Sequence, residues 1–247
     1  GGQGTVWKVQ GVRGACYAMK ELALPGRLWR RDFTANLVRA DREVRCLKRL
    51  RWASSVIVQI IDSWLREDMT LCIVMEWCPF TLKSILTSRR QSNQGPPPPE
   101  DTCRWLAHIV AGIAVIHDEG FMHRDIKPSN LLLTADMYWC KVADMGISRE
   151  VRQAALEKDV EAGSSISETV SAFSGYTAKC GTRGFQSPEV LQGRSYDLSA
   201  DIYSLGCVLL QLLQSEDPDV SPVTAEVAAP LLAESLRAAG VADTTLV

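Results

Sequence analysis

The sequence predicts an α+β fold, β-rich through about residue 78 and mainly helical after it, as one large domain or as two lobes. Short apolar runs typical of strands fill the first part. They cover residues 5–10, 16–20, 57–65 and 71–78. Helical patterns dominate afterwards, over about 100–117 and from Asp201 onward. A chain of 247 residues with 46% hydrophobic content can bury a sizeable core in such an arrangement.

Composition argues against several classes of protein. The net charge of −2 gives no general reason to expect a nucleic acid or an anionic membrane as partner. Eight cysteines without a CxxC pair, and only three histidines, indicate neither a zinc site nor a disulfide framework. Reduced thiols predict an intracellular location, cytoplasmic or nuclear. No apolar run reaches the roughly 18 residues that a membrane-spanning helix needs.

The first two strands are expected to be joined by a turn over residues 11–14, and Lys20 ends the second strand. A helix is predicted next, because Glu43, Leu47 and Leu50 recur at i, i+4 and i+7. This spacing places a carboxylate on the buried face, where it requires a cation, and Lys20 is the candidate partner.

An opposite stripe of the same helix carries three arginines, Arg42, Arg45 and Arg49. Two interpretations stay open. The stripe is either a solvated helix face or a dock for a phosphorylated loop, since arginine clusters bind phosphate through paired hydrogen bonds.

After the strands over 57–65 and 71–78, which a polar turn over 66–70 separates, a short helix is predicted at 81–86. A polar loop over 88–99 follows and ends in four prolines. Glu100 then opens a long amphipathic helix through roughly His117. His108 and His117 are predicted to be ordinary helix residues, and the helix leads the chain to His123.

The stretch from His123 to Asn130 carries the chemistry of the chain. Asp125 and Asn130 lie five residues apart, and Asp144 follows after a short strand-like run. Together with Lys127, these side chains can bring three oxygen ligands and one cation onto a single phosphoryl group. Hard cations prefer carboxylate and amide oxygens, so the pattern indicates phosphotransfer chemistry.

At these residues the chain resembles the eukaryotic protein kinases, whose signature is HRDxKxxN followed by DFG. Lys127 resembles the serine/threonine branch. Further motifs occur in the family's order, similar to VAIK at 17–20, to GTxxYxAPE at 181–189 and to the DxWSxG helix at 201–206. The resemblance implies a bilobal protein-kinase-like fold over 1–214, with lobes at about 1–78 and 79–214. It also implies truncation at both ends and an atypical tail, a candidate for disorder, over 215–247.

The resemblance implies a role for each catalytic position. Asp125 would accept or orient the proton of the substrate hydroxyl, and Lys127 would touch the γ-phosphate of ATP. Thr182 would hydrogen-bond near both. Asn130 and Asp144 would hold Mg²⁺ ions that neutralise charge on the transferred group.

Nucleotide binding is likewise implied by the resemblance. Lys20, supported by Glu43, would pair the α- and β-phosphates of ATP. The other implied nucleotide contacts are Gly1, Gly4 and Val6 in a glycine-rich loop and Met75, Glu76 and Cys78 in the hinge between the lobes. Met145 departs from the family's Phe, and this change is expected to shift the balance between active and inactive arrangements.

Residues 147–179 form a polar stretch rich in Ser and Thr, in the place of the activation loop. Arg124, beside the catalytic Asp, could pair with a phosphate in this loop. Thr177 is the first candidate for phosphorylation, by an activating kinase or by autophosphorylation. A disordered insertion is the alternative interpretation.

The predicted function is a serine/threonine protein kinase that transfers the γ-phosphoryl of MgATP to Ser or Thr hydroxyls of a protein substrate. The alternative is a catalytically inactive kinase-like scaffold or binding module, which Met145 and the missing ends favour. A small-molecule phosphotransferase is a third option. It is disfavoured because residues 181–189 resemble a segment that serves as a platform for peptide substrates.

Overall fold

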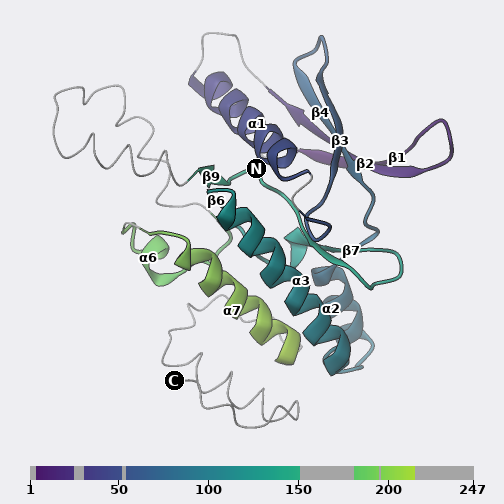
Figure 1. Cartoon of the computed structure of the whole chain (residues 1–247), viewed down its shortest axis with the longest axis vertical. Helices are drawn as coiled ribbons and strands as arrows, with labels where there is room; N and C mark the ends of the chain where they lie inside the picture. The colour runs from purple at the N-terminus through teal and green to yellow at the C-terminus, as the bar shows by residue number, and fades with distance from the viewer. Residues whose placement is uncertain (1–3, 25–30, 52–53, 151–180, 195, 215–247) are drawn as a thin grey trace.

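The computed structural model describes residues 4–24, 31–51, 54–150, 181–194 and 196–214. These residues form a small lobe with a β-sheet and one helix, and a second lobe built mainly of helices (Figure 1). The α+β, two-lobed fold predicted from the sequence is therefore confirmed.

The first lobe contains a four-stranded antiparallel sheet with the order β1-β2-β4-β3. Its strands are β1 (Thr5–Gln10), β2 (Cys16–Ala23), β3 (Ile60–Leu65) and β4 (Thr70–Glu76). In the sheet register Val6 lies opposite Lys20, and Ala18 lies opposite Met75. Directly opposed residues of an antiparallel pair, and residues two apart in a strand, point to the same face. Val6, Ala18, Lys20 and Met75 therefore share one face of the sheet.

Helix α1 (Arg31–Leu50) lies beside this sheet in the first lobe (Figure 1). Glu43, Cys46, Leu47 and Leu50 are all buried, which is the face expected from their helical spacing. The helix thus presents an apolar stripe to the core with one carboxylate in it.

The second lobe is built around helix α3 (Pro99–Asp118), which lies beside α7 (Ser199–Gln214) (Figure 1). The remaining helices are α2 (Leu82–Gln91), α6 (Pro188–Leu191) and the 3₁₀ turn η1 (Pro128–Asn130). Short strands form two further sheets, with the orders β5-β7-β8 and β6-β9. They comprise β5 (Phe80–Thr81), β6 (Phe121–Met122), β7 (Leu131–Leu133), β8 (Cys140–Val142) and β9 (Arg149–Glu150).

A backbone junction ties the segment before β3 to the second lobe. Val142 of β8 donates its N–H to the carbonyl of Val56 at 2.8 Å and accepts from the N–H of Val58 at 2.9 Å. The buried apolar cluster runs across this junction, from Leu47 of α1 to Ile113 of α3 and Val208 of α7. Both lobes therefore share one continuous core.

Several boundaries differ from the sequence-based expectation. The strand predicted over 16–20 continues to Ala23, and the strand predicted over 71–78 spans Thr70–Glu76. The strand predicted over 57–65 begins only at Ile60, because residues 56–58 bond to β8 instead. The helix predicted over 81–86 continues to Gln91, into the expected loop. Thr81 and Ser84 cap its start reciprocally, and buried Leu82 and Leu86 anchor it, which favours a longer helix.

Within the described part of the chain, no helix combines the length and the apolar character needed to cross a membrane.

The contact between α3 and β8 leads to a stability prediction. A Cβ atom at Gly112 would lie 2.8 Å from Cγ2 of Val142 and 3.3 Å from the carbonyl oxygen of Val56. Gly112→Val should therefore lower the free energy of unfolding by about 2–3 kcal/mol, as overpacking of a tight core does. Urea unfolding monitored by circular dichroism measures the change. Ala111→Val, at the exposed neighbouring position, should cost well under about 1 kcal/mol, and equal losses in the two variants would contradict the prediction.

Candidate active site

Asp201, in the first turn of α7, fixes the backbone of the loop that follows β6. Its carboxylate accepts hydrogen bonds from the backbone N–H groups of His123 and Arg124, each at 2.8 Å, and contacts Nε2 of His117 at 2.8 Å. Arg124 has a φ of +68°, a conformation that costs a non-glycine residue energy. The buried carboxylate offsets this cost by satisfying two backbone donors at once.

His123 joins this loop to the segment that carries Asp144. Its buried ring accepts the N–H of Asp125 at Nδ1, at 3.2 Å. Nε2 must then carry the proton and donate it to the carbonyl of Ala143 at 2.9 Å. The backbone N–H of Ala143 donates in turn to the carbonyl of Asn130 at 2.9 Å. The loop and the segment before Asp144 are therefore held side by side.

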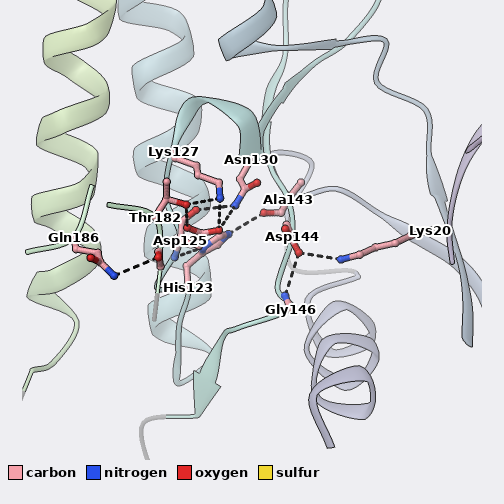
Figure 2. A network of polar contacts seen from close by, with 11 residues as sticks. Lys20, His123, Asp125, Lys127, Asn130, Ala143, Asp144, Gly146, Thr182 and Gln186 are labelled. Atoms are coloured by element: carbon pink, nitrogen blue, oxygen red, sulfur yellow. Dashed lines mark hydrogen bonds and ion pairs between the residues drawn. The ribbon is translucent and has the colours of Figure 1, made fainter. Parts of the chain in front are cut away.

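Asp125 lies at the centre of a compact polar cluster (Figure 2). Nζ of Lys127 donates to one carboxylate oxygen of Asp125 at 2.6 Å and to Oγ1 of Thr182 at 2.6 Å. The Thr182 hydroxyl donates to the other oxygen at 2.8 Å. Nδ2 of Asn130 donates to the backbone carbonyl of Asp125 at 2.8 Å and to its carboxylate at 3.1 Å. The structure thus brings together all three predicted catalytic residues and one predicted metal ligand.

Lys20 reaches from the sheet to two carboxylates. Its Nζ lies 2.6 Å from Oε1 of Glu43. It also lies 3.0 Å from Oδ1 of Asp144, a contact that Figure 2 shows. Lys20 and Glu43 are both buried, at 7% and 2% exposure. The contact joins β2, α1 and the segment after β8.

Electrostatics keep this group charged. Burial by itself would lower the pKa of Lys20, but the negative charges of Glu43 and Asp144 outweigh it, and the pKa is raised. Burial would likewise raise the pKa of Asp144, yet the ammonium of Lys20 outweighs that effect and lowers it. Both members of the Lys20–Asp144 pair are therefore ionised at neutral pH.

The predicted metal ligands offer suitable free atoms. Asn130 donates through Nδ2, so its Oδ1 has no hydrogen bond among the described residues. Oδ2 of Asp144 is likewise unbonded there, because Lys20 and the N–H of Gly146 both contact Oδ1. One amide oxygen and one carboxylate oxygen are the donor types that Mg²⁺ takes when substrate phosphates supply other ligands. The donor set therefore fits the cation, and the groups around it are those that phosphoryl transfer requires.

The predicted hinge residues surround the end of β4. Met75 shares the sheet face of Lys20, whereas Glu76 points its side chain elsewhere. The Glu76 carboxylate contacts Nζ of Lys141 at 2.7 Å and accepts the N–H of Gln59 at 2.8 Å. Its own N–H donates to the carbonyl of Gln59 at 3.0 Å. Cys78 is buried, and burial raises the pKa of its thiol to about 11.

The glycine-rich segment is described in part. Gly1 and Thr177 lie outside the described residues, as does most of the stretch over 147–179. A Cβ atom at Gly4 would approach the carbonyl of Glu21 to 1.8 Å, so β1 starts against β2 at a distance only glycine allows. Val6 follows in β1, opposite Lys20.

Sequence reasoning missed several polar partners. His117, expected to be an ordinary helix residue, contacts Asp201 across 84 positions of the chain. Lys141 forms a nearly buried ion pair with Glu76. No local pattern identifies either pair, because the partners meet only through tertiary packing.

Arginines near the site have partners of their own. Nε of Arg124 donates to the carbonyl of Ile147 at 2.7 Å, and its guanidinium donates to the hydroxyl of Tyr196 at 3.0 Å. In the arginine stripe of α1, Arg49 contacts Glu119 at 3.0 Å and Glu150 at 3.5 Å. Arg45 pairs with Asp41 one turn earlier. Much of the stripe is therefore engaged by carboxylates.

The comparison with protein families agrees with this geometry. A family model described as the protein kinase domain matches residues 1–229. The chain belongs to the protein kinase domain family.

Individual relatives share about a third of the aligned residues. The chain is 27% identical over 212 residues to "Cyclin-dependent kinase F-4" of Oryza sativa subsp. japonica, covering 85% of the chain and 39% of that protein. It is 33% identical over 155 residues to "Serine/threonine-protein kinase PknB" of Mycobacterium leprae (strain TN), covering 62% and 21%. It is 31% identical over 183 residues to "Cell division control protein 2 homolog C" of Antirrhinum majus, covering 72% and 54%. The chain therefore spans only part of the length of each of these relatives.

The Asp201 contacts generate a pH-dependent stability prediction. Burial would raise the pKa of Asp201, but the hydrogen bonds from His117 and from the backbone N–H groups of Arg124 and His123 lower it overall. A carboxyl whose folded pKa is depressed stabilises the fold above its ordinary pKa of about 3.9, and this contribution is lost as pH falls through the folded value. Asp201→Asn should therefore cost about 3 kcal/mol at pH 7, and its difference from wild type should shrink below about pH 4.

Urea unfolding at several pH values measures this difference. Asp118→Asn, which removes an exposed carboxylate at the end of α3, is the control and should change stability little at any of these pH values. A loss in Asp201→Asn that stayed constant down to pH 3 would contradict the assignment.

Proposed function

We propose that this chain is a catalytic serine/threonine protein kinase domain, which transfers the γ-phosphoryl group of ATP to a Ser or Thr hydroxyl of a protein substrate. The observation that carries the proposal is the convergence of Lys127, Asn130 and Thr182 on Asp125. The loop that bears them is hydrogen-bonded to the segment that leads into Asp144. The names of the relatives support the same activity.

The proposed reaction uses these residues in sequence. Asp125 orients the acceptor hydroxyl and takes its proton as the oxygen bonds to the γ-phosphorus. The bond from that phosphorus to the bridging oxygen breaks, and ADP leaves. Lys127 offsets charge on the γ-phosphate, while Lys20 binds the α- and β-phosphates. Positioning and electrostatic stabilisation supply most of the rate.

Magnesium would be held by Oδ1 of Asn130 and by the Asp144 carboxylate, and it would neutralise charge on the transferred phosphoryl group. The face of the sheet that carries Val6, Ala18 and Met75 would cover the nucleotide. Met145 is fully buried in the core, so its thioether replaces the family's Phe as apolar filling. Its burial supports an intact fold around Asp144.

The proposal extends to the surroundings of the site. A protein substrate is the partner, and phosphorylation within residues 147–179 by another kinase or by the chain itself would regulate the enzyme. The proposed compartment is cytoplasmic or nuclear, where ATP is available. The seven cysteines of the described segments form no disulfide bonds, which fits a reducing environment.

Phosphotransfer itself provides the first test. With Mg²⁺ and γ-labelled ATP, the chain should label a generic acceptor protein or itself. Asp144→Asn should reduce the rate by about a hundredfold or more, because it removes a charged metal ligand. Asp62→Asn, which changes an exposed carboxylate in β3, should retain the parent rate. Folded protein that binds ATP without any transfer would instead favour the scaffold or binding-module alternative.

Thr182 allows a finer test of the catalytic cluster. Thr182→Ala removes the hydroxyl that bridges Asp125 and Lys127, so kcat should fall about tenfold to a hundredfold through misplacement of these groups. Thr182→Ser keeps the hydroxyl and should stay within about threefold of wild type. The KM for ATP should change little in either variant. Steady-state kinetics measure both constants, and equal kcat values for the two variants would refute the bridging role.

A further inference from the structure

A cavity of about 220 Å³ opens beside the catalytic cluster. Four parts of the second lobe line it: α2, the loop from Lys127 into η1, the segment with Thr182 and Phe185, and Gln211 near the end of α7. A water molecule occupies roughly 30 Å³ in the liquid, so the cavity has room for a side chain from another molecule.

The position of the cavity links it to the reacting centre. Lys127 and Thr182 both line the cavity, and both contact the carboxylate of Asp125, at 2.6 and 2.8 Å. A substrate hydroxyl that reaches Asp125 therefore lies next to the cavity mouth. An extended peptide advances about 3.3 Å per residue, so a side chain only a few residues from the acceptor can enter the cavity.

One face of α2 forms the wall opposite this cluster. Lys83, Leu86, Thr87 and Arg90 recur at i, i+3, i+4 and i+7, the spacing of a single helix face. Leu86 is buried at the base, whereas Lys83 and Arg90 are exposed at the two ends. Lys83 and Arg90, two helical turns apart, therefore lie on either side of apolar Leu86 and the hydroxyl of Thr87.

The charge of the lining is one-sided. Of the cavity-lining residues that the structure describes, Lys83, Arg90 and Lys127 are cations, and none carries a carboxylate. Lys127 is already paired with Asp125, but Lys83 makes no ion pair or hydrogen bond with any described residue. The sequence of α2 holds no Asp or Glu to compensate. An anion that enters the cavity is attracted, while a cation is repelled.

We infer that this cavity selects substrates that carry an anionic side chain, a carboxylate or a phosphorylated residue, within a few positions of the acceptor Ser or Thr. The inference rests on the proposed function and adds the substrate class to it. Lys83 is its main specificity-determining residue. The apolar lining of Leu86, Pro128 and Phe185 would pack against the stem of the incoming side chain.

Peptide binding tests the inference directly. The probes are fluorescein-labelled peptides of Gly and Ala around one Ser, with a pair of Asp, one phosphoserine, a pair of Arg or no charge placed two to four residues to either side. Fluorescence anisotropy with the full 247-residue chain gives Kd. Anionic peptides should bind about threefold to tenfold more tightly than the neutral one, and this advantage should shrink as NaCl is raised.

Charge reversal assigns the effect to the cavity. Lys83→Glu should abolish or reverse the advantage of anionic peptides. Lys48→Glu makes the same charge change at an exposed position of α1 outside the cavity, and it should preserve the advantage. Equal Kd values for neutral and anionic peptides, tighter binding of the Arg peptide, or equal effects of the two variants would overturn the inference.

The same peptide series distinguishes a preference for a phosphorylated residue from a preference for a carboxylate. Tighter binding of the phosphoserine peptide than of the Asp peptide identifies a substrate primed by earlier phosphorylation, whereas equal binding identifies a general acidic preference. Phosphotransfer to each peptide is measured alongside. If all peptides are bound and phosphorylated equally, the role of the cavity is refuted, but the kinase proposal is supported. If anionic peptides bind in a Lys83-dependent way but no phosphoryl group is transferred, the kinase proposal is refuted, but anion binding by the cavity is supported.

Discussion

The ammonium group of Lys20 lies between two carboxylates that belong to different parts of the fold. Glu43 reaches it from α1, and Asp144 reaches it from the segment after β8. Removing a cation from water is costly, and the cost is recovered only if opposite charges contact it at close range. The sheet, α1 and the Asp144 segment must therefore meet at this point, or a charged group is left buried without a partner. The placement of the sheet face that carries Lys20 relative to the segment with Asp144 depends on this contact.

A second constraint concerns the backbone around the site. Arg124 and Asp144 both have positive φ values, +68° and +65°, which non-glycine residues adopt at an energetic cost. Each is held by polar contacts from outside its own segment. Asp201 accepts the N–H of Arg124, and Lys20 contacts the carboxylate of Asp144. Tertiary contacts thus stabilise backbone conformations that are costly for these two residues by themselves.

The cations around the cavity of the second lobe have different partners. Lys127 contacts Asp125 and Thr182 and so belongs to the polar cluster around Asp125. Lys83, on α2, lines the same cavity as Lys127 and has no ion pair or hydrogen bond with any described residue. Arg89, in the same helix, instead donates to the carbonyls of Gln94, Gly95 and Pro96 and fixes the loop after α2. Two cations of one helix, Lys83 and Arg89, therefore differ in their surroundings: Arg89 is bound to backbone carbonyls, whereas Lys83 has no polar partner among the described residues.

The sequence by itself determined the class of fold, most element positions and the residues that meet at the site. Local spacing indicated the buried face of Glu43, Leu47 and Leu50, and the resemblance of the motif from His123 to Asn130 to that of the protein kinases implied the site residues, because both patterns are encoded within a few residues. Only the tertiary structure decided that residues 56–58 bond to β8, that His117 contacts Asp201, and that Lys83 and Lys127 line one cavity. The physical reason is that such contacts join groups far apart in the chain, whose distance is set by how helices and strands pack rather than by any periodicity along the sequence.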